Sequence, residues 1–81
     1  MSKIDKLIAK LLSNPKSFTW DELIKVMKHF DFEIRTGNGS RRAFVSNVNG
    51  IIYLHEPHPQ KVIKPYQIKI VLEHLRKEKL L

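Results

Sequence analysis

Two short runs of strand-like sequence enclose a glycine-rich segment near the middle of the chain, and this feature constrains the fold most. The runs are residues 32–35 and 41–46, and the segment between them contains two glycines and an asparagine. Because these residue types tolerate positive φ angles, the pattern predicts a turn between two neighbouring strands. The remaining sequence must then supply a small scaffold that holds this hairpin.

Three arginines flank the predicted turn. Backbone N–H groups in a glycine-rich turn, with guanidinium groups on both sides, suit a phosphate better than an apolar ligand. The turn and its arginines are therefore candidate phosphate-binding residues. They are Arg35, Gly37, Gly39, Ser40, Arg41 and Arg42.

A third strand is expected over residues 51–55, which are mostly β-branched or aromatic. The Asn49-Gly50 pair before it is typical of a tight hairpin turn. Pairing about such a turn sets Arg42 roughly opposite His55 and leaves Arg41 near the same strand end. The sequence therefore predicts a cluster of arginine and histidine beside the glycine-rich turn.

Alternation along each strand separates the side chains into two faces. The second strand has one face with Arg42, Phe44 and Ser46, and another with Arg41, Ala43 and Val45. The third strand has one face with Ile52 and Leu54, and another with Ile51, Tyr53 and His55.

Three amphipathic helices are predicted around these strands. Ser2 with Asp5, and Thr19 with Glu22, have the spacing of helix-capping boxes, and Pro65 suits the first turn of the last helix. The first helix should end at Ser13-Asn14-Pro15. The predicted apolar stripes are Ile4, Leu7, Ile8, Leu11 and Leu12; Trp20, Leu23, Ile24 and Met27; and Ile68, Val71, Leu72 and Leu75, widened by Tyr66 and Ile70.

The order of elements is therefore α-α-β-β-β-α, an α+β fold. A three-stranded antiparallel sheet has one face to bury, and the helices are available to cover that face. The chain has 81 residues, which is enough for a single domain over residues 1–81 with one modest core.

Charge and composition narrow the possible partners. Fifteen Lys and Arg against eight Asp and Glu give a net charge of +7, which favours a polyanionic partner. The chain has no cysteine, so thiolate metal sites and disulfides are excluded. An apolar signal core and a run of membrane-spanning length are both missing from the sequence, so we expect a cytoplasmic protein with no membrane partner.

Three stretches together resemble the HicA family of toxins from type II toxin–antitoxin systems. They are Trp20 to Phe32, the Thr36-Gly37-Asn38-Gly39-Ser40 turn, and Leu54 to Pro59 with Lys64-Pro65-Tyr66-Gln67. The resemblance implies a double-stranded-RNA-binding-domain-like fold, α-β-β-β-α, over residues 18–80. Residues 1–14 would then form an additional N-terminal helix. The resemblance also implies an mRNA-cleaving endoribonuclease that needs no cofactor, and a HicB-like antitoxin as partner. In this family a Gly-Ser-His motif carries the catalytic histidine.

This chain departs from the family motif, because Arg41 follows Gly39-Ser40. Arginine stays protonated and cannot act as a general base. Histidine titrates near neutral pH, so His55 and His58 are the candidate catalytic residues. Lys61 and Lys64, ahead of the last helix, are further candidate RNA contacts.

Three alternatives remain open at this stage. One is an RNA-binding module that does not cleave, and another is an interaction domain for an acidic protein. The third is a zinc site at His55-x-x-His58, which would need Glu56 or His74 to converge on it. We expect no metal, because nothing in the spacing requires that convergence.

Overall fold

The computed structural model describes residues 2–13 and 15–81, so the part of the predicted first helix end that falls on Asn14 lies outside the described residues. Three helices and three strands follow in the predicted order α-α-β-β-β-α, which confirms the α+β class. Their bounds are α1 (Lys3–Leu12), α2 (Trp20–His29), β1 (Glu33–Thr36), β2 (Arg41–Ser46), β3 (Gly50–His55) and α3 (Pro65–Lys77).

Both predicted capping boxes are present. The Thr19 hydroxyl accepts a hydrogen bond from the Glu22 N–H at 3.2 Å, and the Glu22 carboxylate accepts one from the Thr19 N–H at 2.9 Å. The same carboxylate pairs with Lys10 of α1 at 3.0 Å. Glu22 therefore caps the start of α2 and also links α2 to α1. Burial raises the pKa of the Glu22 carboxyl, but the hydrogen bonds from Thr19 and Lys10 outweigh this effect and the pKa is lowered.

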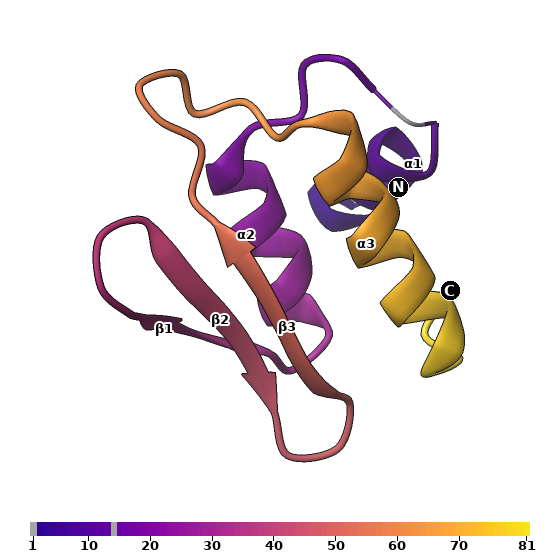
Figure 1. The fold of residues 1–81 in the computed structure, drawn as a ribbon. Coiled ribbons are helices and arrows are strands. Elements are labelled where there is room, and N and C mark those ends of the chain that lie inside the picture. The colour runs from indigo at the N-terminus through magenta and orange to yellow at the C-terminus, as the bar shows by residue number, and fades with distance from the viewer. Residues whose placement is uncertain (1, 14) are drawn as a thin grey trace.

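The sheet has the order β1-β2-β3, with all pairs antiparallel, and α2 and α3 lie on the same side of it (Figure 1). Phe44, Ile52 and Leu54 point into the core between the sheet and these helices and are all at most 5% exposed. The Phe44 ring lies 5.4 Å from the ring of Trp20. The other face of the sheet is not covered by a helix, in agreement with the expected double-stranded-RNA-binding-domain-like arrangement.

The predicted register between β2 and β3 was wrong by one residue. Arg41 pairs with His55, and Arg42 pairs with Leu54. The reason is that the hairpin loop holds three residues, 47–49, between the paired Ser46 and Gly50. Since neighbouring residues on a strand face opposite sides, this shift puts Arg41, and not Arg42, on the same face as His55.

Side-chain contacts hold the three-residue loop in place. The buried Ser46 hydroxyl accepts hydrogen bonds from the N–H groups of Val48 and Asn49. The Asn49 side-chain amide donates to the Phe30 carbonyl, and the Asn49 carbonyl accepts a 2.6 Å hydrogen bond from His74 of α3. The loop is therefore tied to both α2 and α3.

Three predicted stripe residues do not belong to the core. Tyr66 is 57% exposed, Ile70 is 40% exposed and Leu12 is 44% exposed. The buried stripe of α3 is narrower than the prediction, because one face of the helix already fills the space above the sheet. Among the residues that the structure describes, no helix combines the length and the hydropathy that crossing a membrane requires.

Candidate nucleic-acid interface

The glycine-rich turn is a compact connection between β1 and β2. The Gly37 N–H donates to the Arg41 carbonyl at 2.8 Å, and the Arg41 N–H donates to the Asn38 carbonyl at 3.1 Å. Gly39 has a φ of 59°, which a glycine adopts without strain. The amides of Gly37 and Arg41 are used inside the turn, so their N–H groups are not free to bind a phosphate.

Ser40, Arg41 and His55 come together at the end of the β2–β3 ladder. Arg41 and His55 are direct cross-strand partners, and His55 Nδ1 lies 3.1 Å from Ser40 Oγ. All three side chains are exposed. Arg41 and His55 also line one surface hollow of about 360 Å³, together with Tyr53 and Arg42. The predicted cluster of arginine and histidine is present, with Arg41 as the arginine that faces His55.

The Ser40 contact leaves one nitrogen of His55 without a partner among the hydrogen bonds of the described residues. When Nδ1 carries the proton and donates to Ser40 Oγ, Nε2 has a free lone pair and can accept a proton. When both nitrogens carry a proton, Nδ1 still donates to Ser40 Oγ, and Nε2 can release its proton as an acid. The pair therefore fixes the imidazole in a position from which Nε2 can act as a base or as an acid.

Arg42 and Lys61 both bind the carboxylate of Glu56. Arg42 Nε lies 3.3 Å from one carboxylate oxygen, and Lys61 pairs with the other. Arg42 also donates to the carbonyls of Gly39 and Arg41 at 2.9 and 2.7 Å. The Lys61 hydrogen bond is the largest cause of a lowered pKa of Glu56; partial burial opposes it, and the charges of Lys61 and Arg42 add to it. Arg42 therefore links the loop after β3 to the glycine-rich turn, and Lys61 joins two parts of that loop through Glu56.

His58 and Lys64 lie in a different part of the surface. Both line a hollow in the 56–64 loop that also includes Lys16, and this hollow shares no lining residue with the one beside His55. Arg35, the remaining predicted RNA contact, is exposed on β1. The structure thus brings together Ser40, Arg41 and His55, and separates them from His58.

The ligands considered for a zinc site do not converge. His74 donates to Asn49 at the opposite end of the sheet from His55, and Glu56 binds Arg42 and Lys61. In residues 2–13 and 15–81, no three His, Asp or Glu side chains are grouped to hold a metal ion.

Gln67 contributes to this site, although the sequence analysis assigned it no role. Its side chain is 2% exposed and donates to the His55 carbonyl at 2.8 Å, while its amide oxygen accepts from the Lys64 N–H at 3.1 Å. The start of α3 is therefore fastened to the end of β3. A polar residue directly before the buried stripe of an amphipathic helix is the sequence signal for such a contact.

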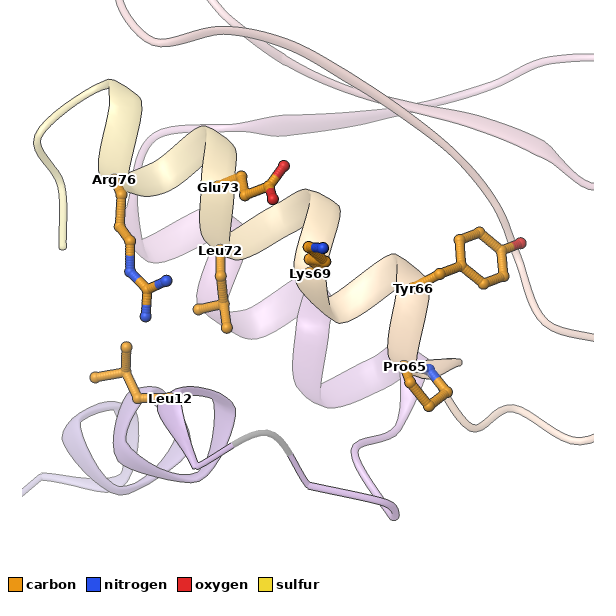
Figure 2. A pocket seen from close by; sticks show the side chains of 7 residues that line it. All are labelled: Leu12, Pro65, Tyr66, Lys69, Leu72, Glu73 and Arg76. Carbon is orange, nitrogen blue, oxygen red and sulfur yellow. The ribbon is translucent and has the colours of Figure 1, made fainter.

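A larger hollow of about 490 Å³ lies between α1 and α3 (Figure 2). Leu12 and Arg76 approach each other across it, and Tyr66 lies at its far end. It contains none of the candidate site residues and no histidine. The pair of Arg41 and His55 therefore lies beside the glycine-rich turn and not in this hollow.

Comparison with known proteins matches the part of the chain that contains this site. A family model described as the HicA toxin of bacterial toxin–antitoxin systems matches residues 20–76. The match spans α2, the whole sheet and all of α3 except Lys77, and it leaves α1 outside. No curated protein and no solved structure matches the chain.

Proposed function

The chain belongs to the HicA toxin family, and from this premise we propose that it binds RNA and cleaves mRNA, with His55 as the residue that transfers the proton. The observation that carries the proposal is the cross-strand pair of Arg41 and His55. The residue that follows Gly-Ser in this chain cannot be a base, and a histidine faces it on the next strand. The family's proton-transfer chemistry is thus available on the same face of the same sheet.

The proposed reaction is an internal transfer that needs no attacking water and no metal ion. The ribose 2′-oxygen attacks the adjacent phosphorus, its proton passes to His55 Nε2, and the bond to the 5′-oxygen breaks. The 5′-oxygen leaves with a proton taken from solvent, and a 2′,3′-cyclic phosphate remains. An imidazole held in position by Ser40 suits the first proton transfer.

The cations of the site have two different roles in this proposal. Arg35 and Arg41 are exposed and present guanidinium groups to the phosphate chain, and Arg41 lies where negative charge develops during attack. Arg42 and Lys61 hold Glu56 and thereby place the turn and the loop, and Lys61 remains half exposed for a phosphate contact. Gly37, Gly39 and Ser40 shape the turn that the RNA crosses, and Lys64 adds positive charge in the loop.

As a member of a toxin family, the chain is expected to act with an antitoxin, and we assign that role to a HicB-like protein. A protein that covers the exposed Arg41–His55 site would block RNA from it. Since mRNA is the proposed substrate, the cytoplasm is the proposed place of action.

A second candidate function is RNA binding without cleavage. The observation that favours it is Arg41 itself, which replaces the family's catalytic residue and can still hold a phosphate.

The deciding experiment is cleavage of a single-stranded RNA by the purified protein, with chelator present, beside His55→Ala and the matched variant His58→Ala. Both histidines are exposed, so both variants should fold, which circular dichroism checks. The proposal expects cleavage by the native protein and by His58→Ala, loss of cleavage in His55→Ala, and unchanged RNA affinity in all three. Salt-sensitive binding without cleavage by the native protein would establish the second candidate.

A further inference from the structure

The side chain of Tyr53 is largely exposed on the uncovered face of the sheet. The exposed fraction is 74%, although Tyr53 belongs to a regular strand with a neighbour on β2. A row runs across the sheet from Arg35 on β1 through Ala43 on β2 to Tyr53 on β3. Ala43 has a small side chain and lies between the larger Arg35 and Tyr53. The surface is therefore depressed above Ala43 and raised on either side of it.

The depression above Ala43 is a hollow of about 250 Å³. Arg35, Gly37, Arg41, Arg42, Ala43 and Tyr53 are among its lining residues. Tyr53 also lines the hollow that contains His55, as Arg41 and Arg42 do, so the two hollows adjoin. The site therefore presents an aromatic ring in the row that contains Arg35, next to the row of Arg41 and the candidate catalytic His55.

We propose that the hollow above Ala43 is a subsite for one unpaired nucleobase, which stacks on Tyr53 while the adjoining phosphates bind Arg35 and Arg41. This inference rests on the proposed function and names its substrate: single-stranded RNA. Aromatic rings on a sheet face recognise unpaired bases by stacking. Paired bases in a duplex are stacked on one another and offer only their edges.

The distribution of charge on this face favours the same ligand. Arg35 and Arg41 lie at the turn end of the sheet, beside the hollow. Glu33 lies on the same face of β1, one row further from the turn, where it pairs with Val45. A phosphate chain is therefore attracted to the rows that contain Tyr53 and His55.

The spacing along β3 connects the subsite to the proposed reaction. Tyr53 and His55 are two residues apart on one face, a separation of about 7 Å along the strand. A base stacked on Tyr53 thus leaves its neighbouring linkage within reach of His55. The subsite would select unpaired positions in mRNA for cleavage.

The test measures the affinity of a labelled oligouridine with 2′-O-methyl groups, which binds but has no free 2′-hydroxyl to react. Tyr53→Ala should weaken binding roughly five- to 150-fold, the range expected for loss of one base–aromatic stack. Tyr53→Phe keeps the ring and should bind like the native protein. Ala43→Leu, which fills the hollow, should weaken binding as Tyr53→Ala does.

Matched measurements separate this subsite from general charge effects. Ile51→Ala removes an exposed apolar side chain from the same face of β3 and should leave the affinity unchanged. The dependence of binding on salt should stay the same in Tyr53→Ala, because its phosphate contacts remain. The oligouridine paired with its complement should bind more weakly than the single strand, and Tyr53→Ala should not alter that weaker binding.

Different experimental results would contradict the Tyr53 subsite and the proposed function. If the native protein binds and cleaves RNA but Tyr53→Ala binds oligouridine as tightly as the native protein, the subsite is wrong and the function stands. Equal affinity for single strand and duplex would also overturn the subsite. If the native protein binds no RNA, both proposals fail, and Tyr53 belongs to a surface for a protein partner.

Discussion

Arg41 and His55 face each other across β2 and β3 on the uncovered face of the sheet. Side chains of directly opposed residues have Cβ atoms about 4.5–5.5 Å apart. The catalytic histidine that the family motif places after Gly-Ser would therefore lie next to the present His55. In the proposed site the imidazole comes from β3, beside the glycine-rich turn that precedes β2.

This relationship predicts that the two histidine positions can substitute for each other. His55→Ala should abolish cleavage, and adding Arg41→His should restore part of it, because the new side chain reaches the same space from β2. Cleavage rates of the native protein, His55→Ala and the double variant test this. An inactive double variant that still folds and binds RNA would show that only β3 can supply the base.

Ser40→Ala should slow cleavage without weakening RNA binding. The variant removes the hydroxyl that lies 3.1 Å from His55 Nδ1 and so frees the imidazole to rotate. A hydrogen bond contributes about 1 kcal/mol net, so kcat should fall roughly fivefold while KM stays nearly constant. Ser40→Thr keeps the hydroxyl and should recover the rate. An equal rise in KM would instead assign Ser40 to substrate binding.

Glu56 should stabilise the fold in neutral solution and lose this effect in acid. Its pKa is lowered from 4.5 in the folded chain, first by the Lys61 hydrogen bond and then by the charges of Lys61 and Arg42. Its contribution is therefore present above about pH 4.5 and is lost as the pH falls through the lowered pKa. The unfolding free energies of the native protein and Glu56→Gln in urea should differ at pH 7, and the difference should shrink as the pH falls from about 4.5 through the lowered pKa; a constant difference would contradict this.

The two faces of the sheet should respond very differently to truncation. Phe44 is 1% exposed and packs on Trp20, so Phe44→Ala should cost about 3–5 kcal/mol, a large part of the stability of a domain this small. Tyr53→Ala removes a side chain from the uncovered face and should change stability by no more than about 0.5 kcal/mol. Urea unfolding followed by circular dichroism measures both.

Local signals in the sequence were sufficient for the helices and strands. The capping boxes at Ser2 and Thr19 and the proline at the start of α3 each involve residues within one turn of the chain. The alternation of β2 and β3 correctly separated Phe44 and Ile52 from Arg41 and Tyr53. These features depend on contacts over three or four residues, which a sequence pattern contains in full.

The residues of the candidate site were predicted only in part, because a sequence pattern contains local contacts and not contacts between residues distant in sequence. Residue type and position near the glycine-rich turn were sufficient to name the exposed group of Ser40, Arg41 and His55. Glu56 and Gln67 were not assigned their roles, because each acts through residues distant in sequence. Glu56 joins Arg42 to Lys61, and Gln67 reaches back to the His55 carbonyl.

The sequence by itself determined the order of elements, the helix starts and the two faces of each strand. Only the tertiary structure decided which face of β2 meets which face of β3. That choice depends on the length of one loop, set by Ser46 and by contacts of Asn49 with Phe30 and His74. A shift of one residue reverses every side chain, so these distant contacts place Arg41 opposite His55 and Phe44 in the core.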